Sequence, residues 1–180
     1  METLDRDKLI GSMRAATQEV FATMLGLEIA PEEAYVEANS SGTVDGVVAL
    51  IGLAGNWVGG GIIHCDVPLA RKLYKHFLMA ECEPAGDGVN EEVLDAIAEI
   101  ANMIIGNVKN EVESMVGNIG MGIPSVVYGR KFTTRNAGSN WVVAPFACEG
   151  AHIWVKVCLN PPSSSSATPE LSRARRLMPA

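Results

Sequence analysis

A chain of 180 residues is long enough for one domain with a substantial hydrophobic core. Hydrophobic residues make up 48% of it and charged residues 19%, a composition that excludes a largely disordered protein. The formal net charge of −7 argues against nucleic acid or an anionic membrane as the main partner. No apolar run reaches the roughly 18 residues that a membrane-spanning helix needs, and the charged N-terminus lacks the apolar segment of a signal peptide. We therefore expect a cytoplasmic protein with reduced cysteines.

The first half of the chain predicts two helices with strands between them. Apolar spacing predicts a first helix that ends at Gly26. The turn signal Ala54-Gly55-Asn56 separates two stretches rich in Val, Ile and Gly, which favours a hairpin. Pro68 suits the first turn of a second helix. The expected elements are a helix over 6–25, a short strand over 35–39, strands over 43–53 and 57–67, and a helix over 69–80.

The longest predicted helix covers residues 91–116. Asn90 is a suitable N-cap, Glu91 and Glu92 suit the positive end of the helix dipole, and Gly117 is a natural stop. A helix advances about 100° per residue, so its apolar side chains gather on one side, which we expect to face the core. They are Val93, Leu94, Ile97, Ile100, Ala101, Ile104, Ile105 and Val108.

The chain after this helix predicts a sheet and a tail. Glu149-Gly150 indicates a hairpin, and short local connections favour an antiparallel sheet with helices packed on it. We expect one domain over residues 1–160. Residues 161–180 are rich in proline and serine and predict a disordered tail. The expected elements are a glycine-rich turn over 118–122 and strands over 124–128, 131–135, 140–148 and 151–159.

The other side of the long helix carries a polar stripe. Its members fall within roughly 60° of one another on the helix. A mid-helix glycine costs about 1 kcal/mol relative to alanine and leaves a dent where another group can approach closely. By spacing alone, the simplest interpretation is a solvated helix face. The stripe consists of Asp95, Glu99, Asn102 and Gly106.

A shift of 80 residues aligns two helical segments of the chain. Residues 19–26 then match residues 99–106, with Glu, Met and Gly coinciding. Ala22, however, stands opposite Asn102, and Ala15 stands opposite Asp95. The match favours an internal duplication of a helix-plus-strands unit in which one copy lost its polar pair, although eight residues can also match by chance.

Other candidate motifs carry little chemistry. The glycines between Gly52 and Gly61 lack the GK[ST] end of a P-loop, so a hairpin explains them better. His64 and Cys65 would point to opposite faces of a strand, and no metal-ligand spacing is present. No nucleophile motif is present either. We expect no metal site and no cofactor bound by this chain itself.

The stretch from Asp95 to Asn107 resembles the signature helix of the CheC/CheX family of chemotaxis phosphatases. The shared pattern is an acidic residue, then ExxN from Glu99 to Asn102, then Gly106-Asn107. ATQEVFATMLGLEI near the start, the glycine hairpin and Pro124-Ser-Val-Val-Tyr-Gly129 agree as well. CheC-like members carry two ExxN sites and CheX-like members one, so Ala22 makes this chain similar to CheX.

The resemblance implies an α/β fold of the α+β type, with three helices and an antiparallel sheet of about six strands. It also implies a homodimer and, as partner, a phosphorylated CheY-like receiver domain that carries its own Mg²⁺. Asn102 would then orient the attacking water and Glu99 would pair with the receiver's lysine. Asp95 would extend the contact, and Gly106 would permit close docking.

Two functions remain open at this point. One is a phosphatase that hydrolyses the aspartyl phosphate of a receiver domain, with Glu99 and Asn102 as its catalytic residues. The other is a non-catalytic receiver-binding or dimerisation module that uses the same helix for docking. The amide of Asn102 favours the first, because docking alone would not need an amide beside the glutamate.

Overall fold

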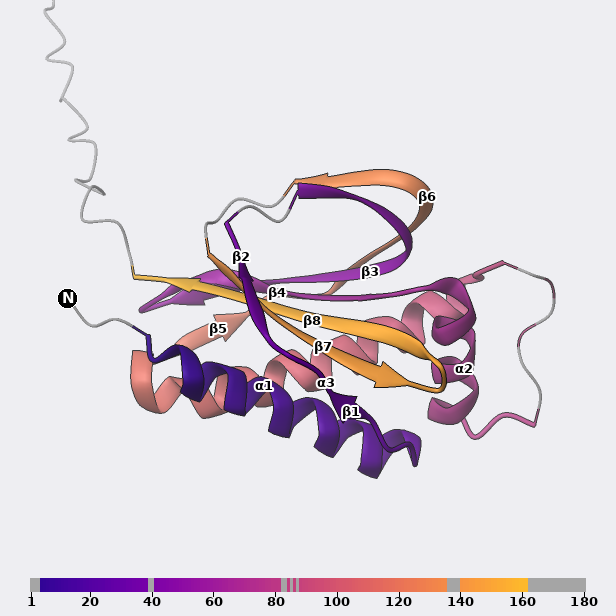
Figure 1. Ribbon diagram of the computed structural model, residues 1–180, viewed down its shortest axis with the longest axis horizontal. Coiled ribbons are helices and arrows are strands. Elements are labelled where there is room, and N and C mark those ends of the chain that lie inside the picture. The colour runs from indigo at the N-terminus through magenta and orange to yellow at the C-terminus, as the bar shows by residue number, and fades with distance from the viewer. Residues whose placement is uncertain are drawn as a thin grey trace, which may run out of the picture.

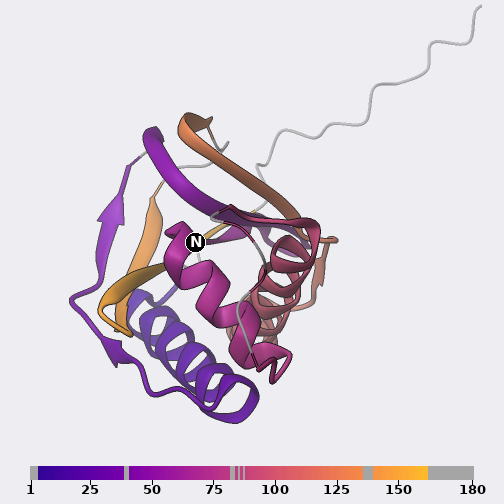
Figure 2. The same ribbon diagram turned by 90° about the vertical axis from the view of Figure 1, so that its right-hand side faces the viewer.

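The computed structural model describes residues 4–38, 41–81, 84, 86, 88–135 and 140–161. Within them the chain forms one antiparallel sheet of eight strands, with three α-helices on one face (Figures 1 and 2). No helix in these ranges is long and apolar enough to cross a membrane. The elements are α1 (Arg6–Val20), a π-helical turn η1 (Phe21–Leu25), β1 (Ala30–Pro31), β2 (Tyr35–Glu37), β3 (Ser41–Gly55), β4 (Val58–Cys65), α2 (Val67–Phe77), α3 (Glu91–Val116), β5 (Ile119–Met121), β6 (Ser125–Arg135), β7 (Trp141–Cys148) and β8 (Ala151–Asn160).

The order of the strands repeats about the centre of the sheet. The path is β1-β7-β8-β4-β3-β5, so β8 and β4 lie side by side in the middle. β7 pairs with β2 near its start and with β1 near its end, while β3 pairs with β6 near its start and with β5 near its end. The helix α1 therefore precedes two strands, β1 and β2, that pair with β7 from the second half of the chain. In the same way α3 precedes β5 and β6, which pair with β3 from the first half. This symmetry agrees with the predicted duplication of a helix-plus-strands unit.

The core lies between the helices and the sheet, as the apolar pattern predicts. Figure 2 shows α1, α2 and α3 on the same side, with α1 and α3 running along the sheet. Of the apolar residues predicted to face the core, Leu94 is half-buried and the others are buried. On β3, residues 47, 49, 51 and 53 face the helices, because side chains alternate along a strand.

Local signals fix the limits of the helices. The Asn90 side chain accepts a hydrogen bond from the Val93 N–H at 3.0 Å, and Gly117 ends α3 with φ +80°. The predicted N-cap and stop of the long helix are thus confirmed. The first helix reaches Gly26 (φ +63°) as predicted, but its last turn, η1, is π-helical. The second helix ends at Phe77, before the predicted limit of residue 80.

The sheet has eight strands where about six were expected. β5 lies within residues 118–122, which the sequence predicted as a turn, and β1 was not predicted. Both are short and depend on distant partners: Leu53–Gly55 pairs with β5, and Phe146–Ala147 pairs with β1. The two strands predicted over 124–128 and 131–135 form the single strand β6. The predicted tail lies outside the described residues, apart from Pro161.

The cysteines agree with the prediction of reduced thiols where the structure describes them. Cys65 and Cys148 are free and buried, and Cys158 is buried and accepts a hydrogen bond from the Asn160 amide at 3.1 Å. Cys82 lies outside the described residues. Burial raises the pKa of the Cys65 thiol far above its ordinary value. A thiol in this state stays protonated and is a poor nucleophile.

Close packing of α3 on β4 generates the first prediction. A Cβ added at Gly61 would lie 2.5 to 2.8 Å from three side-chain atoms of Ile105 in α3. Gly61→Ala is therefore expected to lower the free energy of unfolding by about 1–3 kcal/mol, measured by urea denaturation. Gly52→Ala on the neighbouring strand is the control, since nothing lies within 4 Å of its added Cβ. Equal stabilities of the two variants would contradict this account of the packing.

Candidate functional site

The polar stripe of α3 lies on the side of the helix that faces away from the core. Asp95 and Glu99 are exposed, while Asn102 and Gly106 are half-buried. This placement follows from the helix period, because burial of the apolar side leaves the opposite side for these residues. The structure therefore brings together all of the residues that the resemblance assigns to the site.

The functional groups of the stripe are not engaged by the chain itself. In the part of the chain that the structure describes, no hydrogen bond or ion pair joins the side chain of Asp95, Glu99 or Asn102 to another residue. Nearby acids differ: Glu92 accepts a hydrogen bond from the Tyr74 hydroxyl at 2.9 Å. The two carboxylates and the amide are thus available to an incoming partner.

A groove runs beside the stripe. It has a volume of about 610 Å³ and lies between α3 and the segment that joins β5 to β6. One wall carries the acids and the amide of the stripe, and the other is apolar. Its lining residues are Asp95, Ala98, Glu99, Asn102, Met121, Gly122, Ile123 and Pro124.

The second wall was not predicted as part of the site. The sequence placed residues 118–122 in a glycine-rich turn and assigned no role to Ile123. An isolated apolar residue between Gly122 and Pro124 is the only local signal, and it says nothing about which helix lies nearby. The wall forms because β5 pairs with β3, and this pairing returns the chain alongside the helix it has just left.

Several interactions hold this wall in place against β3 and α3. The Gly122 N–H donates to the Gly52 carbonyl at 2.9 Å. The Ile119 N–H donates to Glu113 Oε1 at 3.0 Å, and Lys109 Nζ lies 3.0 Å from the same oxygen. The Ile119 N–H, followed by Lys109, holds the pKa of Glu113 below its ordinary value. A charged Glu113 thus ties the end of α3 to the start of β5.

The dent at Gly106 borders on this wall. A Cβ added there would lie 3.6 Å from Met121 Cε, which is an ordinary van der Waals distance. Met121 of the same chain therefore lies next to the glycine. The site retains room for one methyl group at this point.

The equivalent segment of the first helix lacks an amide. Glu19 and Ala22 are both exposed, but alanine offers no group that could hold a water. Ala22 lies within η1, and Gly26 ends the helix four residues later. In α3 the helix continues past Gly106 to Val116.

The histidines lie elsewhere and have other neighbours. His64 stacks on Trp154 with ring centroids 4.9 Å apart, on the sheet face opposite Cys65, and burial lowers its pKa. His152 contacts Glu32 at 3.1 Å, and His76 contacts the Leu25 carbonyl. The described residues contain no group of three or more His, Cys, Asp or Glu that could hold a metal ion.

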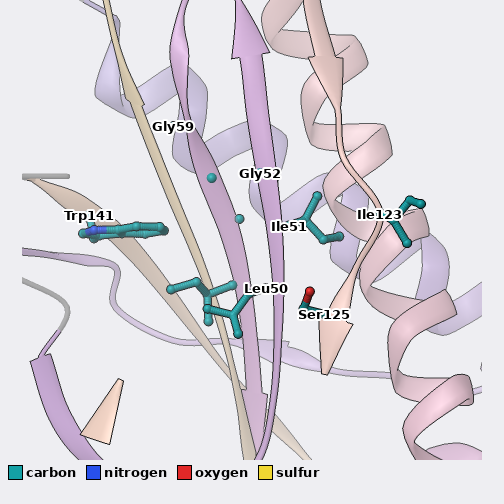
Figure 3. A pocket seen from close by; sticks show the side chains of 10 residues that line it. Leu50, Ile51, Gly52, Gly59, Ile123, Ser125 and Trp141 are labelled. Atoms are coloured by element: carbon teal, nitrogen blue, oxygen red, sulfur yellow. The ribbon is translucent and has the colours of Figure 1, made fainter. Parts of the chain in front are cut away.

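A second, smaller hollow lies over the glycines of β3 and β4. Figure 3 shows Trp141 on one side of it and Ile51 and Ser125 on the other. Its volume is about 270 Å³. Its lining residues are apolar or glycine except for Ser125, and none of them is an acid, a base or a thiol. Its residues are Leu50, Ile51, Gly52, Gly59, Gly60, Gly61, Ile62, Ile123, Ser125 and Trp141.

Comparison with known proteins identifies the family. A family model described as "Chemotaxis phosphatase CheX" matches residues 47–147, a range that contains all of α3 and both walls of the groove. The chain belongs to the CheX family. None of the curated protein sequences compared with it matches.

Solved structures of CheX proteins share the fold. The crystal structure of a chemotaxis protein CheX from Desulfovibrio desulfuricans has a TM-score of 0.74 at 24% identity, covering 85% of this chain and 99% of that one. CheX from Vibrio vulnificus gives 0.70 at 27% identity, with the same coverage. The matched chain of the CheX-CheY-BeF3-Mg complex from Borrelia burgdorferi gives 0.70 at 25% identity, covering 84% and 97%.

The space beside Gly106 generates a second prediction. Gly106→Ala is expected to raise the free energy of unfolding by up to about 1 kcal/mol, because alanine favours a helix and the added methyl fits beside Met121. Gly11→Ala is the matched control, since it changes a glycine of α1 with nothing within 4 Å of the added Cβ. Thermal unfolding of both variants measures the effect. Stabilisation by Gly11→Ala with destabilisation by Gly106→Ala would show that Met121 leaves no room.

Proposed function

We propose that this CheX-family protein binds a CheY-like receiver domain and hydrolyses its aspartyl phosphate. The observation that carries the proposal is the position of Glu99 and Asn102, which lie outward on α3, in one groove and without partners among the described residues. The crystal structure of a CheX-CheY-BeF3-Mg complex from Borrelia burgdorferi supports the choice of partner. The family description supports the reaction.

The role proposed for Asn102 follows from the chemistry of phosphoryl transfer. The transition state is loose, so catalysis consists mainly of positioning and electrostatic stabilisation. A receiver supplies Mg²⁺ and a lysine for the phosphoryl oxygens but lacks a group that orients the water. A neutral amide can accept from and donate to one water molecule, holding it in line with phosphorus. A carboxylate in that place would be repelled by the phosphoryl group.

Glu99 has the complementary role. It lies one turn before Asn102 on α3 and is exposed, so its carboxylate can pair with the receiver's active-site lysine. That pair would place the amide opposite the phosphorus. Asp95, one further turn back, would extend the contact to the receiver surface, and Gly106 would let the partner approach the helix closely. In this proposal Mg²⁺ belongs to the receiver, and this chain contributes no metal ligand.

A second candidate function is a non-catalytic module of the same fold that binds a receiver or forms a homodimer. The exposed acidic wall of the groove favours docking in general. The amide of Asn102, next to Glu99 in the same groove, favours hydrolysis over docking alone. A homodimer is part of the proposal and is tested by sedimentation of the purified chain.

The decay of a labelled phosphorylated CheY-like receiver tests the reaction. The unmodified protein is expected to accelerate it. Asn102→Ala is expected to lower the accelerated rate of decay by about 100-fold or more, while receiver binding is largely retained. Glu99→Ala should weaken both binding and hydrolysis, because the charge pair serves both.

Two further variants sharpen this test. Asn102→Asp keeps the size of the side chain but adds a negative charge beside the phosphoryl group, so it should also remove the acceleration. Asn110→Ala changes an exposed asparagine of α3 outside the groove and should leave the rate unchanged. If Asn102→Ala accelerated the decay as much as the unmodified protein does, the catalytic assignment would be falsified and the docking module would remain.

A further inference from the structure

Ile123 is an unusual residue in the wall opposite the polar stripe. The residue is 90% exposed although its side chain is fully apolar. Single exposed apolar residues are common on protein surfaces, so exposure alone assigns no role. Here, however, the residue lines the same groove as Glu99 and Asn102. In Figure 3 it lies at the bend between β5 and β6, on the side of that segment away from Ser125.

The backbone that carries Ile123 is held in place before any partner arrives. Gly122 bonds to the Gly52 carbonyl at 2.9 Å, Met121 pairs with Leu53 of β3, and Pro124 has a fixed φ. A preformed contact loses little conformational entropy on binding, so its apolar area contributes more fully to affinity. The backbone that carries Ile123 is therefore fixed beside the proposed site.

The charges of the groove define the partner's chemistry. Asp95 and Glu99 make one wall acidic. Lys109 of the same helix is drawn to Glu113 at 3.0 Å and does not line the groove. A surface that fits must place a cation opposite α3 and an apolar group opposite Ile123. The phosphorylated face of a receiver supplies the cation, because the lysine next to the aspartyl phosphate lies there.

We propose that Ile123, held by the segment Gly122–Pro124, is an apolar anchor that binds the receiver surface beside the phosphorylated aspartate. This inference rests on the proposed function and extends it. Glu99 and Asn102 approach the reacting groups from α3, while Ile123 contacts an apolar patch of the same partner from the other wall. The anchor sets affinity and takes no part in hydrolysis.

The test separates binding from chemistry. The affinity of Ile123→Ser for a CheY-type receiver activated with beryllofluoride and Mg²⁺ is measured by calorimetry, and the decay of the labelled phospho-receiver is measured below and above saturation. Ile123→Ser is expected to weaken binding about tenfold and to leave the rate at saturation unchanged. Ile123→Leu should restore the affinity, because it keeps the apolar area.

The matched control is Met79→Ser. Met79 is 88% exposed and apolar, but it lies after α2 and does not line the groove. Met79→Ser should bind the receiver with the affinity of the unmodified protein. Because Ile123 is exposed, its substitution is not expected to alter folding, and thermal unfolding of each variant checks this.

Three results would overturn the anchor. The first is unchanged affinity of Ile123→Ser, and the second is a lower rate at saturation, which would give Ile123 a part in hydrolysis. The third is loss of a homodimer with unchanged receiver binding, which would assign Ile123 to contact with a second copy of this chain. Failure of the proposed function is seen separately: the unmodified protein would then bind the receiver without accelerating the decay, while the effect of Ile123→Ser on affinity would still support or exclude the anchor.

Discussion

The contact between α3 and the centre of the sheet fixes the helical wall of the proposed site. Ile105 packs where Gly61 of β4 has no side chain, so the helix approaches the sheet more closely than any larger residue would allow. Once that side of the helix is buried, the 3.6-residue period also determines which residues lie on the opposite side. Glu99 and Asn102 then face outward, because the burial of Ile100, Ile104 and Ile105 fixes the rotation of the helix about its axis.

The second wall of the groove depends on topology instead of helical period. After Gly117 ends α3, the chain enters β5 and pairs with the end of β3. This antiparallel pairing and the Glu113 contact to Ile119 return the chain to the side of the helix that it left. The groove is thus a product of two elements adjacent in sequence and fixed by a third, β3, from the other half of the molecule.

The sequence predicts the elements whose signals are local. Asn90 and Gly117 define α3 because capping involves residues three or four apart, and apolar spacing defines its buried side. The polar stripe that carries the proposed site could be found in the same way. β5 could not be found, because three residues with two glycines nearby look like a turn until β3 pairs with them. Ile123 was not predicted as part of the groove for the same reason, since the pairing of β5 with β3 determines which residues lie across from it.

The comparison between the two halves shows why one helix carries the proposed site. Both halves place an exposed glutamate on the outer side of a helix, at Glu19 and Glu99. The first helix ends at Gly26, and the hollow at its end is bordered by Lys75 and His76 of α2. In the second half, α3 continues to Val116, so it is long enough for Glu113 to bond to Ile119 in the segment that leads to the apolar wall. The halves therefore differ in helix length and neighbouring charge as well as at the position of Ala22. The groove with an acidic and an apolar wall lies in the second half.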